Sequence, residues 1–284
     1  MTVDVVRARE FLSSSARLLE QQLCAMSFDG DSATPVLAAL AAYRNENGGW
    51  GHALEPDLRG PDSQVSAAMS ALSVLARVGA TNHPWVAETC DWLSDHALPD
   101  GSVPQVLPGA ERSPAAPWMR PNTQGFLTFA IAAHLWELRV EHPWLLVASE
   151  WCWHQIEHGE LTGYQAVFAL QFLDAVPDVS RATAAVQRFR ASLDENGNIP
   201  IPGGVDGEHV APLTLSPRPG TPSRSLFSPE VIDHELSALE ESQQEDGGWD
   251  FDFLHWSPEQ ARDWRGIVTL DALETLHLHG RLPG

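Results

Sequence analysis

The segment LEESQQEDGGW (239–249) carries the pattern that decides the fold, and RNENGGW (44–50) is a second copy of its core. In each copy a polar residue, Gln243 or Arg44, is followed by x-x-x-Gly-x-Trp. Weaker echoes are LPDGSVP (98–104), EHGELTG (157–163) and DENGNIP (194–200). Asp or Asn with Gly ends one helix in a left-handed cap, and a spacing of roughly forty to sixty residues suits a two-helix unit. The sequence therefore predicts stacked helical hairpins.

The segments between these turns have helical periodicity. FLTFAIAAHLWEL (126–138) and QAVFALQFLDAV (165–176) repeat apolar residues at i, i+3, i+4 and i+7, and alternating strand patterns are hardly visible. We expect an all-α chain with helices near 4–27, 33–45, 62–79, 83–97, 122–139, 143–157, 162–175, 178–193, 229–244 and 259–279.

Composition narrows the function classes. The net charge of −21 excludes nucleic acid and anionic headgroups as partners, because phosphate binding needs a surplus of Lys and Arg. Cys24, Cys90 and Cys152 are widely spaced and odd in number, which indicates free thiols in a reducing compartment. The first residues lack the apolar stretch of a signal peptide, and no window is long and apolar enough for a transmembrane segment. We expect a cytoplasmic protein.

The second copy resembles the Gln-x-x-x-Gly-x-Trp repeat of squalene–hopene cyclases and related terpenoid cyclases. The layout is similar to the α/α toroid that these enzymes share with the β subunit of protein prenyltransferases. GGWGHALEPDLRGPDSQ (48–64) with WRGIVTLDAL (264–273) is also similar to a bacterial group of stand-alone prenyltransferase-like proteins. The resemblance implies an inner ring of helices round a cavity, here 62–79, 122–139, 162–175 and 259–279.

From the resemblance we expect a single toroid domain over 1–284, with five to six hairpins. Two long segments rich in Pro, Gly and Ser, 98–121 and 200–228, would cap the cavity.

The resemblance also indicates where an acid should lie. Class II cyclases protonate their substrate with the middle residue of Asp-x-Asp-Asp at the start of an inner helix, in a setting that raises the pKa of an aspartic acid. The equivalent stretch here is DSQVS (62–66), with Gln64 in the donor position. The candidate acids are therefore Glu55, Asp57, Asp62, Asp250 and Asp252.

Two polar clusters surround these acids. The stretch GHALEPDLRG (51–60) packs His52 and Arg59 among its acids, and capping the next helix does not require such density. The cluster is either an ion-pair brace or a polar site facing the cavity. The parallel set after the second copy is Asp250, Asp252, His255, Asp263 and Arg265. In a closed toroid the first and last hairpins are neighbours, so the two sets would converge on one site.

Aromatic residues complete the candidate site. Eleven tryptophans and ten phenylalanines suit a cavity for an apolar ligand, where ring faces stabilise a carbocation, or else they fill a large core. Trp50 and Trp249 are interpreted as structural, and Trp118, Trp256 and Trp264 as cavity residues. The residues expected to bind substrate are His52, Arg59, Gln64, Trp118, Gln124, His255, Trp256, Asp263, Trp264 and Arg265.

No metal or other cofactor is expected. Protein prenyltransferases hold zinc with an Asp, a Cys and a His, but RDWRGIVTLDAL (262–273) has Arg265 and Gly266 where a histidine would be expected, and no cysteine nearby. HQIEH (154–158) matches the inverted zincin pattern, yet it closes an outer helix, where histidine also suits exposed carbonyls.

The favoured function is a class II-like terpenoid cyclase that cyclises or isomerises an isoprenoid or similar apolar substrate. The alternatives are a non-catalytic protein that binds a hydrophobic ligand on a degenerate cyclase scaffold, and a carbohydrate-active α/α barrel with paired carboxylates. A homodimer is left open.

Overall fold

The computed structural model describes residues 3–202 and 208–282, which form twelve α-helices and two very short strands. The mostly helical architecture predicted from the turns and the periodicity is confirmed. The helices are α1 (Val5–Ser15), α2 (Leu18–Asp29), α3 (Thr34–Leu40), α4 (Val65–Arg77), α5 (Pro84–Asp95), α6 (Leu127–Glu137), α7 (Pro143–His158), α8 (Tyr164–Ala175), α9 (Val179–Val186), α10 (Pro212–Leu215), α11 (Pro229–Glu241) and α12 (Pro258–Leu278).

The chain divides into two compact units. The larger spans residues 43–231, and the smaller joins 1–42 to 232–284. We call them the central unit and the terminal unit, and each is described by itself.

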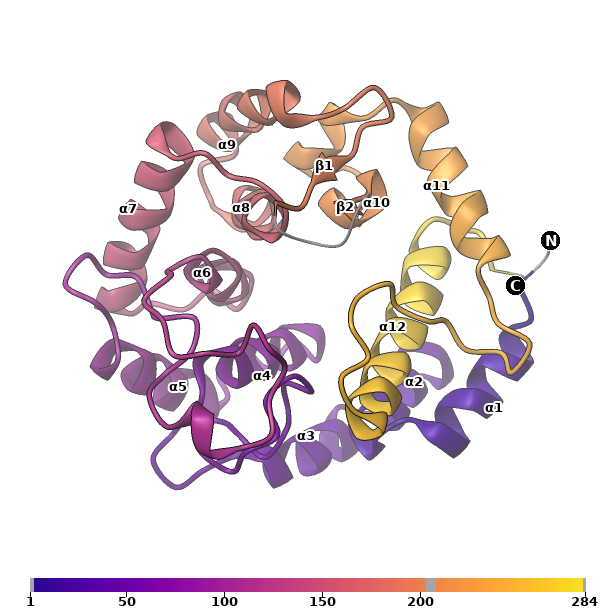
Figure 1. Ribbon diagram of the computed structural model, residues 1–284, viewed down its shortest axis with the longest axis horizontal. Coiled ribbons are helices and arrows are strands. Elements are labelled where there is room, and N and C mark those ends of the chain that lie inside the picture. Colours follow the sequence, from indigo (N-terminus) through magenta and orange to yellow (C-terminus); the bar gives the residue numbers. More distant parts are fainter. Residues whose placement is uncertain (1–2, 203–207, 283–284) are drawn as a thin grey trace. The chain divides into compact units, whose positions relative to one another are not determined.

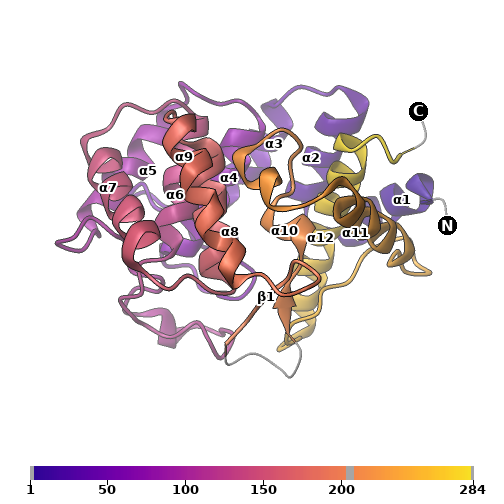
Figure 2. The ribbon, with the colours of Figure 1, turned by 90° about the horizontal axis from the view of Figure 1, so that it is seen from above.

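The central unit has two layers of helices. α4, α6 and α8 pack side by side in one layer, and α5, α7 and α9 cover them as the second layer (Figures 1 and 2). The first layer holds the central unit's three predicted inner helices, and the second holds predicted outer helices. α6 lies in the middle and is buried on nearly every side, with Phe129 and Ile131 fully enclosed. This explains its almost uninterrupted apolar sequence.

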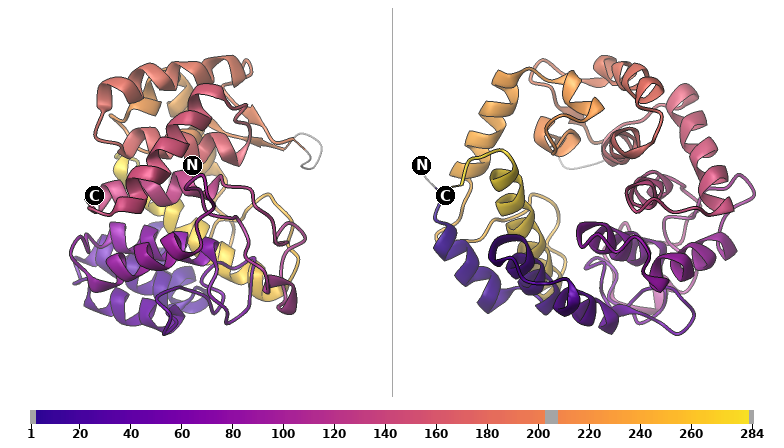
Figure 3. Two further views of the ribbon diagram at one scale, coloured as in Figure 1. Left: turned by 90° about the vertical axis from the view of Figure 1, so that its left-hand side faces the viewer. Right: turned by 180° about the vertical axis from the view of Figure 1, so that it is seen from behind.

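In the terminal unit α12 packs against α1 and α2, and α3 packs on α2 (Figure 3). The single helix predicted over 4–27 is wrong, because the backbone is extended at Ala16 and Arg17. Arg17 forms a buried two-pronged ion pair with Glu20, with N–O distances of 2.6 and 2.9 Å. Gly266 of α12 makes room for the bend, since a Cβ there would lie 2.9 Å from that of Ala16.

The segment 200–228 also differs from the prediction of a plain loop. It contains α10 and a 3-10 helix over Pro222–Leu226. Strand β1 (Ile199–Pro200) pairs antiparallel with β2 (His209–Val210). Of the helix predicted over 178–193, only Val179–Val186 is α-helical, and Gln187–Ser192 forms a 3-10 helix. Adding α10 and dividing the first predicted helix brings the ten expected helices to twelve.

Four of the five predicted repeat turns share one backbone geometry. In each, the first residue of the turn donates its backbone N–H to the carbonyl four residues on, as from Asn45 to Gly49 and from Asp194 to Asn198. Asn47, Asp100 and Asp246, directly before the turn glycine, also accept through Oδ1 the N–H two residues further on. The glycine of each of the four turns has a φ between 85° and 91°, a conformation that only glycine adopts readily. The fifth, EHGELTG, is different, because Gly159 is extended with a φ of −86°. The prediction of a left-handed cap there is wrong.

Candidate functional site

The first Gly-Gly-Trp turn fixes the loop that follows it in the central unit. Trp50 is fully buried and donates its indole N–H to the hydroxyl of Thr89 on α5, at 2.8 Å. Arg44 forms an ion pair with Glu88 of the same helix. The turn is therefore locked against α5, and Trp50 has the structural position expected for it.

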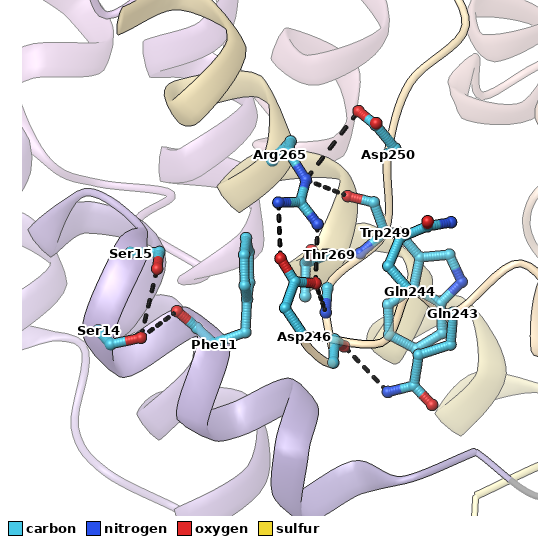
Figure 4. A network of polar contacts seen from close by, with 12 residues as sticks. Phe11, Ser14, Ser15, Gln243, Gln244, Asp246, Trp249, Asp250, Arg265 and Thr269 are labelled. Carbon is cyan, nitrogen blue, oxygen red and sulfur yellow. Dashed lines mark hydrogen bonds and ion pairs between the residues drawn. The ribbon is translucent and has the colours of Figure 1, made fainter. Parts of the chain in front are cut away.

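The second turn is fixed in the same manner in the terminal unit, as Figure 4 shows. Trp249 is buried and donates its indole N–H to the carbonyl of Leu239, at 2.8 Å. Gln243 exchanges hydrogen bonds with the backbone of Asp4, just before α1. Gly247 lies so close to α1 that a Cβ would be 2.5 Å from the backbone of Arg7. The first turn is thus bonded to α5, and the second to α11 and to the residue just before α1.

Arg265 braces this second turn (Figure 4). Its guanidinium binds both carboxylate oxygens of Asp246 at 2.8 and 2.9 Å, and its plane lies over the ring of Phe11. The ion pair raises the pKa of Arg265 and lowers that of Asp246. Asp250 lies 4.0 Å from Nε of the same arginine. Arg265 therefore holds the turn against α1, which gives it a structural task beside the expected contact with substrate.

In the central unit, loop 51–64 lies under the long loop 98–121. Arg59 donates its backbone N–H to the carbonyl of Pro114 at 2.9 Å, and Ala116 donates to the carbonyl of Asp57 at 2.8 Å. Gln64 is buried, and its side-chain oxygen accepts the N–H of Leu107 at 2.9 Å. Gln64, which the sequence analysis expects in the substrate site, therefore anchors the covering loop.

This covering buries two of the candidate acids. Asp57 is only 4% exposed, and its carboxylate accepts the indole N–H of Trp118 at 3.1 Å. Glu55 is 7% exposed, and its Oε1 lies 3.3 Å from the backbone nitrogen of Asp57. Trp118 itself is 39% exposed. The structure brings together Glu55, Asp57 and Trp118.

The other predicted residues of this region lie nearer the surface. Asp62 is exposed and forms an ion pair with Arg112, at 3.1 Å. His52 is exposed, with its Nε2 at 2.8 Å from the side-chain oxygen of Asn45. Arg59 is half-buried and Gln124 is exposed.

In loop 250–257 of the terminal unit, both candidate acids are exposed. Asp252 is exposed, and Asp250 lies 3.7 Å from the Nε2 of His255. Asp263, on α12, is buried, and Trp256 and Trp264 are half-buried. Of the five candidate acids, only Glu55 and Asp57 are buried.

The same loop contains an aromatic cluster that includes two residues absent from the predicted set. Phe251 stacks on the ring of His255 with 4.1 Å between centroids, and it lies 4.3 Å from the ring of Phe253. Phe253 meets Trp264 edge to face at 5.3 Å. The alternation DFDFLHW, which places Phe at every second position between acids, is the signal that could have identified them.

A second polar network lies at the C-terminal ends of α6 and α8, and none of its residues belongs to the predicted site. His134 of α6 lies 3.2 Å from Glu137 and 3.2 Å from the side-chain nitrogen of Gln171 on α8. Glu137 also pairs with Arg218, at 2.5 Å. Although burial alone would raise it, the hydrogen bond from His134 and the charge of Arg218 bring the pKa of Glu137 down to about 2.

Asp174 lies in the last turn of α8. It accepts the N–H and the hydroxyl of Ser223 at 2.8 and 2.6 Å, and burial raises its pKa. The hydroxyl oxygens of Ser223 and Ser216 lie 2.9 Å apart, and Nε of Arg224 donates to the Ser216 hydroxyl. The segment 211–227 contributes all of these partners and Arg218, so a Pro- and Ser-rich stretch that predicts a loop supplies a buried polar cluster.

The cysteines and the histidines of HQIEH are the remaining residues for which the sequence suggests chemistry. All three cysteines are free and buried, and burial raises the pKa of Cys90 to about 12. Within residues 3–202 and 208–282, no three His, Cys, Asp or Glu side chains are grouped to hold a metal ion. His154 and His158 lie together on α7, with ring centroids 4.8 Å apart. None of the described helices is long and apolar enough to cross a membrane.

No family model and no curated protein matches the chain, but solved structures match almost its whole length. The type II terpene cyclase MstE from Scytonema, without ligand, has a TM-score of 0.60 at 13% identity and covers 98% of each chain. An Asp-to-Asn variant of MstE in complex with geranylgeranyl dihydroxybenzoate, its substrate, has a TM-score of 0.58 at 13% identity, covering 97% of this chain and 96% of that one. A protein from Actinoplanes has a TM-score of 0.57 at 15% identity, covering 97% and 98%.

The chain therefore has the helical fold of type II terpene cyclases. MstE is one enzyme with this fold that the chain resembles, and at this identity the likeness concerns the fold alone. The resemblance predicted from the Gly-x-Trp turns is confirmed at that level. The convergence of Asp57 and Asp252 on one site stays a prediction, because the two residues belong to different units.

Proposed function

We propose that the protein is a class II-like terpenoid cyclase or isomerase, in which Asp57 protonates an isoprenoid or similar apolar substrate. The buried Asp57 carboxyl with its Trp118 partner carries the proposal. Protonating an alkene requires a carboxylic acid in a site that excludes water, and Asp57 is the most deeply buried of the candidate acids. The fold shared with MstE, whose structures hold a geranylgeranyl substrate, supports the same chemistry.

The reaction begins at the Asp57 carboxyl. Its proton forms a new C–H bond with one alkene carbon, and the other carbon becomes a cation that the remaining alkenes can attack to close rings. Trp118 holds the carboxylate by its indole N–H and thereby orients the acid. Glu55, beside the Asp57 backbone, helps to shape this site.

The proposal includes the full α/α toroid, as one domain with an apolar central cavity. The layer of α4, α6 and α8 would line that cavity, and segments 98–121 and 200–228 would cap it. Residues of α8 with half-buried side chains, among them Phe168 and Gln171, would contact substrate. The aromatic stacking of Phe126 on Phe168 at 6.0 Å suits an apolar chain beside this layer. Cytoplasmic location and homodimer formation stay predictions.

One observation favours the second candidate, a protein that binds a hydrophobic ligand without turning it over. Gln64 occupies the position of the family's proton donor, and its side chain is used to anchor Leu107. If Asp57 does not act as an acid, the protein would still bind an apolar ligand in its cavity but would not convert it.

The test uses the purified chain with geranylgeranyl dihydroxybenzoate, the substrate held by MstE, and with shorter prenylated dihydroxybenzoates. Turnover should give a product of unchanged mass with fewer alkenes, observed by mass spectrometry and NMR. Binding of the probe without conversion would support the binding protein instead. Neither binding nor conversion of any prenylated probe would contradict both candidates.

Matched variants identify the acid. Asp57→Asn should abolish conversion, whereas Asp62→Asn, which changes an exposed carboxyl in the same loop, should leave it unchanged. Trp118→Phe keeps the ring and removes the N–H, so it should slow the reaction roughly 10-fold, the loss of one charge-assisted hydrogen bond. Full activity of Asp57→Asn would contradict the assignment of Asp57 as the acid.

A further inference from the structure

Gln171 of α8 lies at the end of a series of polar contacts that fixes its side chain. Arg218 pairs with Glu137 at 2.5 Å, and Glu137 lies 3.2 Å from Nδ1 of His134. Nε2 of His134 in turn lies 3.2 Å from the side-chain nitrogen of Gln171. Both ring nitrogens of the histidine are thus occupied, and the series ends at the amide of Gln171.

These contacts decide which way the Gln171 amide faces. Its nitrogen can only donate, so Nε2 of His134 accepts from it and Nδ1 carries the ring proton toward Glu137. Reversal of the amide would set its oxygen against the lone pair of Nε2. The side-chain oxygen of Gln171 is therefore the branch that does not contact His134. Among residues 3–202 and 208–282 it has no hydrogen-bond partner, and it is not a buried atom.

Gln171 also lies in the middle of the face of α8 that stays partly exposed. Leu173, two residues on and about 200° round the helix, is fully buried. Tyr164, seven residues before Gln171 and so on its face, is 43% exposed, and Phe168 between them is half-buried. The unpaired oxygen of Gln171 is therefore an acceptor held in place on the accessible side of the first layer.

The next turn of this face is aromatic. Phe168, three residues before Gln171, stacks on Phe126 of α6 with 6.0 Å between the centroids and 9° between the planes. A ligand that reached the Gln171 oxygen would have these rings within one helical turn. Such a neighbourhood suits the carbon skeleton of an isoprenoid or an aromatic ring attached to it.

We propose that the side-chain oxygen of Gln171 accepts a hydrogen bond from a hydroxyl group of the ligand, so that the protein selects isoprenoids that carry a phenol or an alcohol. The isoprenoid part of this ligand rests on the proposed function. An amide oxygen only accepts, so an ionised carboxylate or diphosphate finds no donor there. A hydroxyl donates and is uncharged, which suits a half-buried face with apolar neighbours better than an ammonium group does.

The test is equilibrium binding of two probes that differ only in their hydroxyl groups. Geranylgeranyl dihydroxybenzoate, the compound held by MstE, is compared with geranylgeranyl benzoate, which lacks both hydroxyls. Gln171→Leu keeps the size of the side chain and removes the acceptor. It should lower the preference for the dihydroxy probe, taken as the ratio of the two Kd values, roughly 10-fold, the effect of about one hydrogen bond. His134→Leu, which lets the amide turn, should lower the same ratio by a smaller factor.

Two further comparisons sharpen the result. Geranylgeraniol and the hydrocarbon without its hydroxyl make the same pair for an alcohol. An effect of Gln171→Leu on this pair would show that an alcohol is accepted, and an effect confined to the benzoates would show that the hydroxyl is a phenol. Gln155→Leu, which removes a half-buried glutamine of α7 in the second layer, should leave both ratios unchanged.

The outcomes separate this inference from the proposed function. If Gln171→Leu does not fold, Gln171→Met replaces it. Ratios that no Gln171 variant changes would overturn the role of Gln171, whether or not the wild type converts the probes. A ratio that falls in the variant, without conversion by the wild type, would support the hydroxyl contact and contradict the cyclase alone. A wild-type chain that binds none of the probes would overturn both.

Discussion

The two Gly-Gly-Trp turns share one backbone and differ in everything that follows them. Both use a side-chain oxygen to accept the N–H two residues on, a glycine with positive φ and a buried Trp that donates a hydrogen bond. After Trp50 the chain enters a loop whose acid, Asp57, is buried under a second loop. After Trp249 it enters a loop whose acid, Asp252, is exposed.

The comparison shows that the repeat stabilises the fold, and that the burial of the acid after the turn depends on which segment covers the next loop. In the central unit the long loop 98–121 pairs with loop 51–64 through Leu58 and Ala115. In the terminal unit the acid nearest to the turn, Asp250, lies beside Arg265 and His255. Two copies of the same turn motif therefore do not predict the same burial for the acids that follow them.

The largest expected effect tests the difference between the two acids. Asp57→Asn should lower turnover of a prenylated probe by roughly 100-fold or more, because general acids contribute at least that much. Asp252→Asn, an equally conservative change at an exposed position, should lower it far less. Steady-state rates of both variants, with their melting temperatures as a control for folding, make the comparison.

Two outcomes would change this view. Equal and large losses from both variants would show that the two loops act as one site. Full activity of Asp57→Asn with loss at Asp252 would reverse the assignment of the acid.

The next effect compares the glycines of the two turns. An alanine at Gly247 would need φ of 91° and would place its Cβ 2.5 Å from the backbone of Arg7. At Gly48 the φ is 85°, but the closest contact, with the carbonyl oxygen of Glu88, is 3.1 Å. Gly247→Ala should lower the free energy of unfolding by roughly 3 kcal/mol and Gly48→Ala by about 1–2 kcal/mol. Denaturant titration measures both, and an equal loss would show that φ alone matters.

These glycines also show how far the sequence predicts the structure. The Gly-x-Trp spacing indicated the helical fold and the buried tryptophans, because a turn that needs positive φ is visible as Asn or Asp before Gly. The bend at Ala16 was missed, since Arg17 and Glu20 suit a helix and only their buried pairing with the fold around them favours the break. Residues 200–228 read as a loop, yet they hold α10 and Ser223.

The candidate site was predictable in part for a similar reason. The density of acids in loop 51–64 drew attention to Glu55 and Asp57, but their burial depends on loop 98–121, which no local pattern links to them. His134 lies in an apolar run and meets Gln171 and Arg218 only through the fold. A lone histidine on such a helix is indistinguishable, in sequence, from a core residue.

A smaller effect, confined to acid pH, separates the two ion-paired acids of the two units. The folded-state pKa of Glu137 is lowered from 4.5 to about 2, so its contribution to stability is complete above pH 4.5 and is lost as the pH falls toward 2. It amounts to at most about 3 kcal/mol, and to less where solvent screens the pair. Glu137→Gln should therefore unfold more easily than wild type at pH 6 and converge with it near pH 2.

Asp246 provides the contrast, because its pKa is lowered by Arg265 at a more exposed site. Asp246→Asn should show a shallower loss over the same acid range, measured as the midpoint of urea unfolding against pH. A steeper pH dependence for the Asp246 pair would mean that the terminal unit, and not the network at His134, limits acid stability.

The smallest effect compares the tryptophans themselves. Trp50→Phe and Trp249→Phe remove the same ring and the same indole N–H, so their common packing loss cancels in the difference. Trp50 donates to Thr89, whose side chain is fully buried, and its loss leaves that hydroxyl with fewer partners. Trp249 donates to the carbonyl of Leu239, which also accepts the hydroxyl of Ser242 at 2.9 Å and so keeps a partner. We expect Trp50→Phe to be the more destabilising by about 0.5–1 kcal/mol, from paired denaturant curves. A larger loss at Trp249 would show that its backbone N–H contact with Thr269, at 2.9 Å, depends on the indole as well.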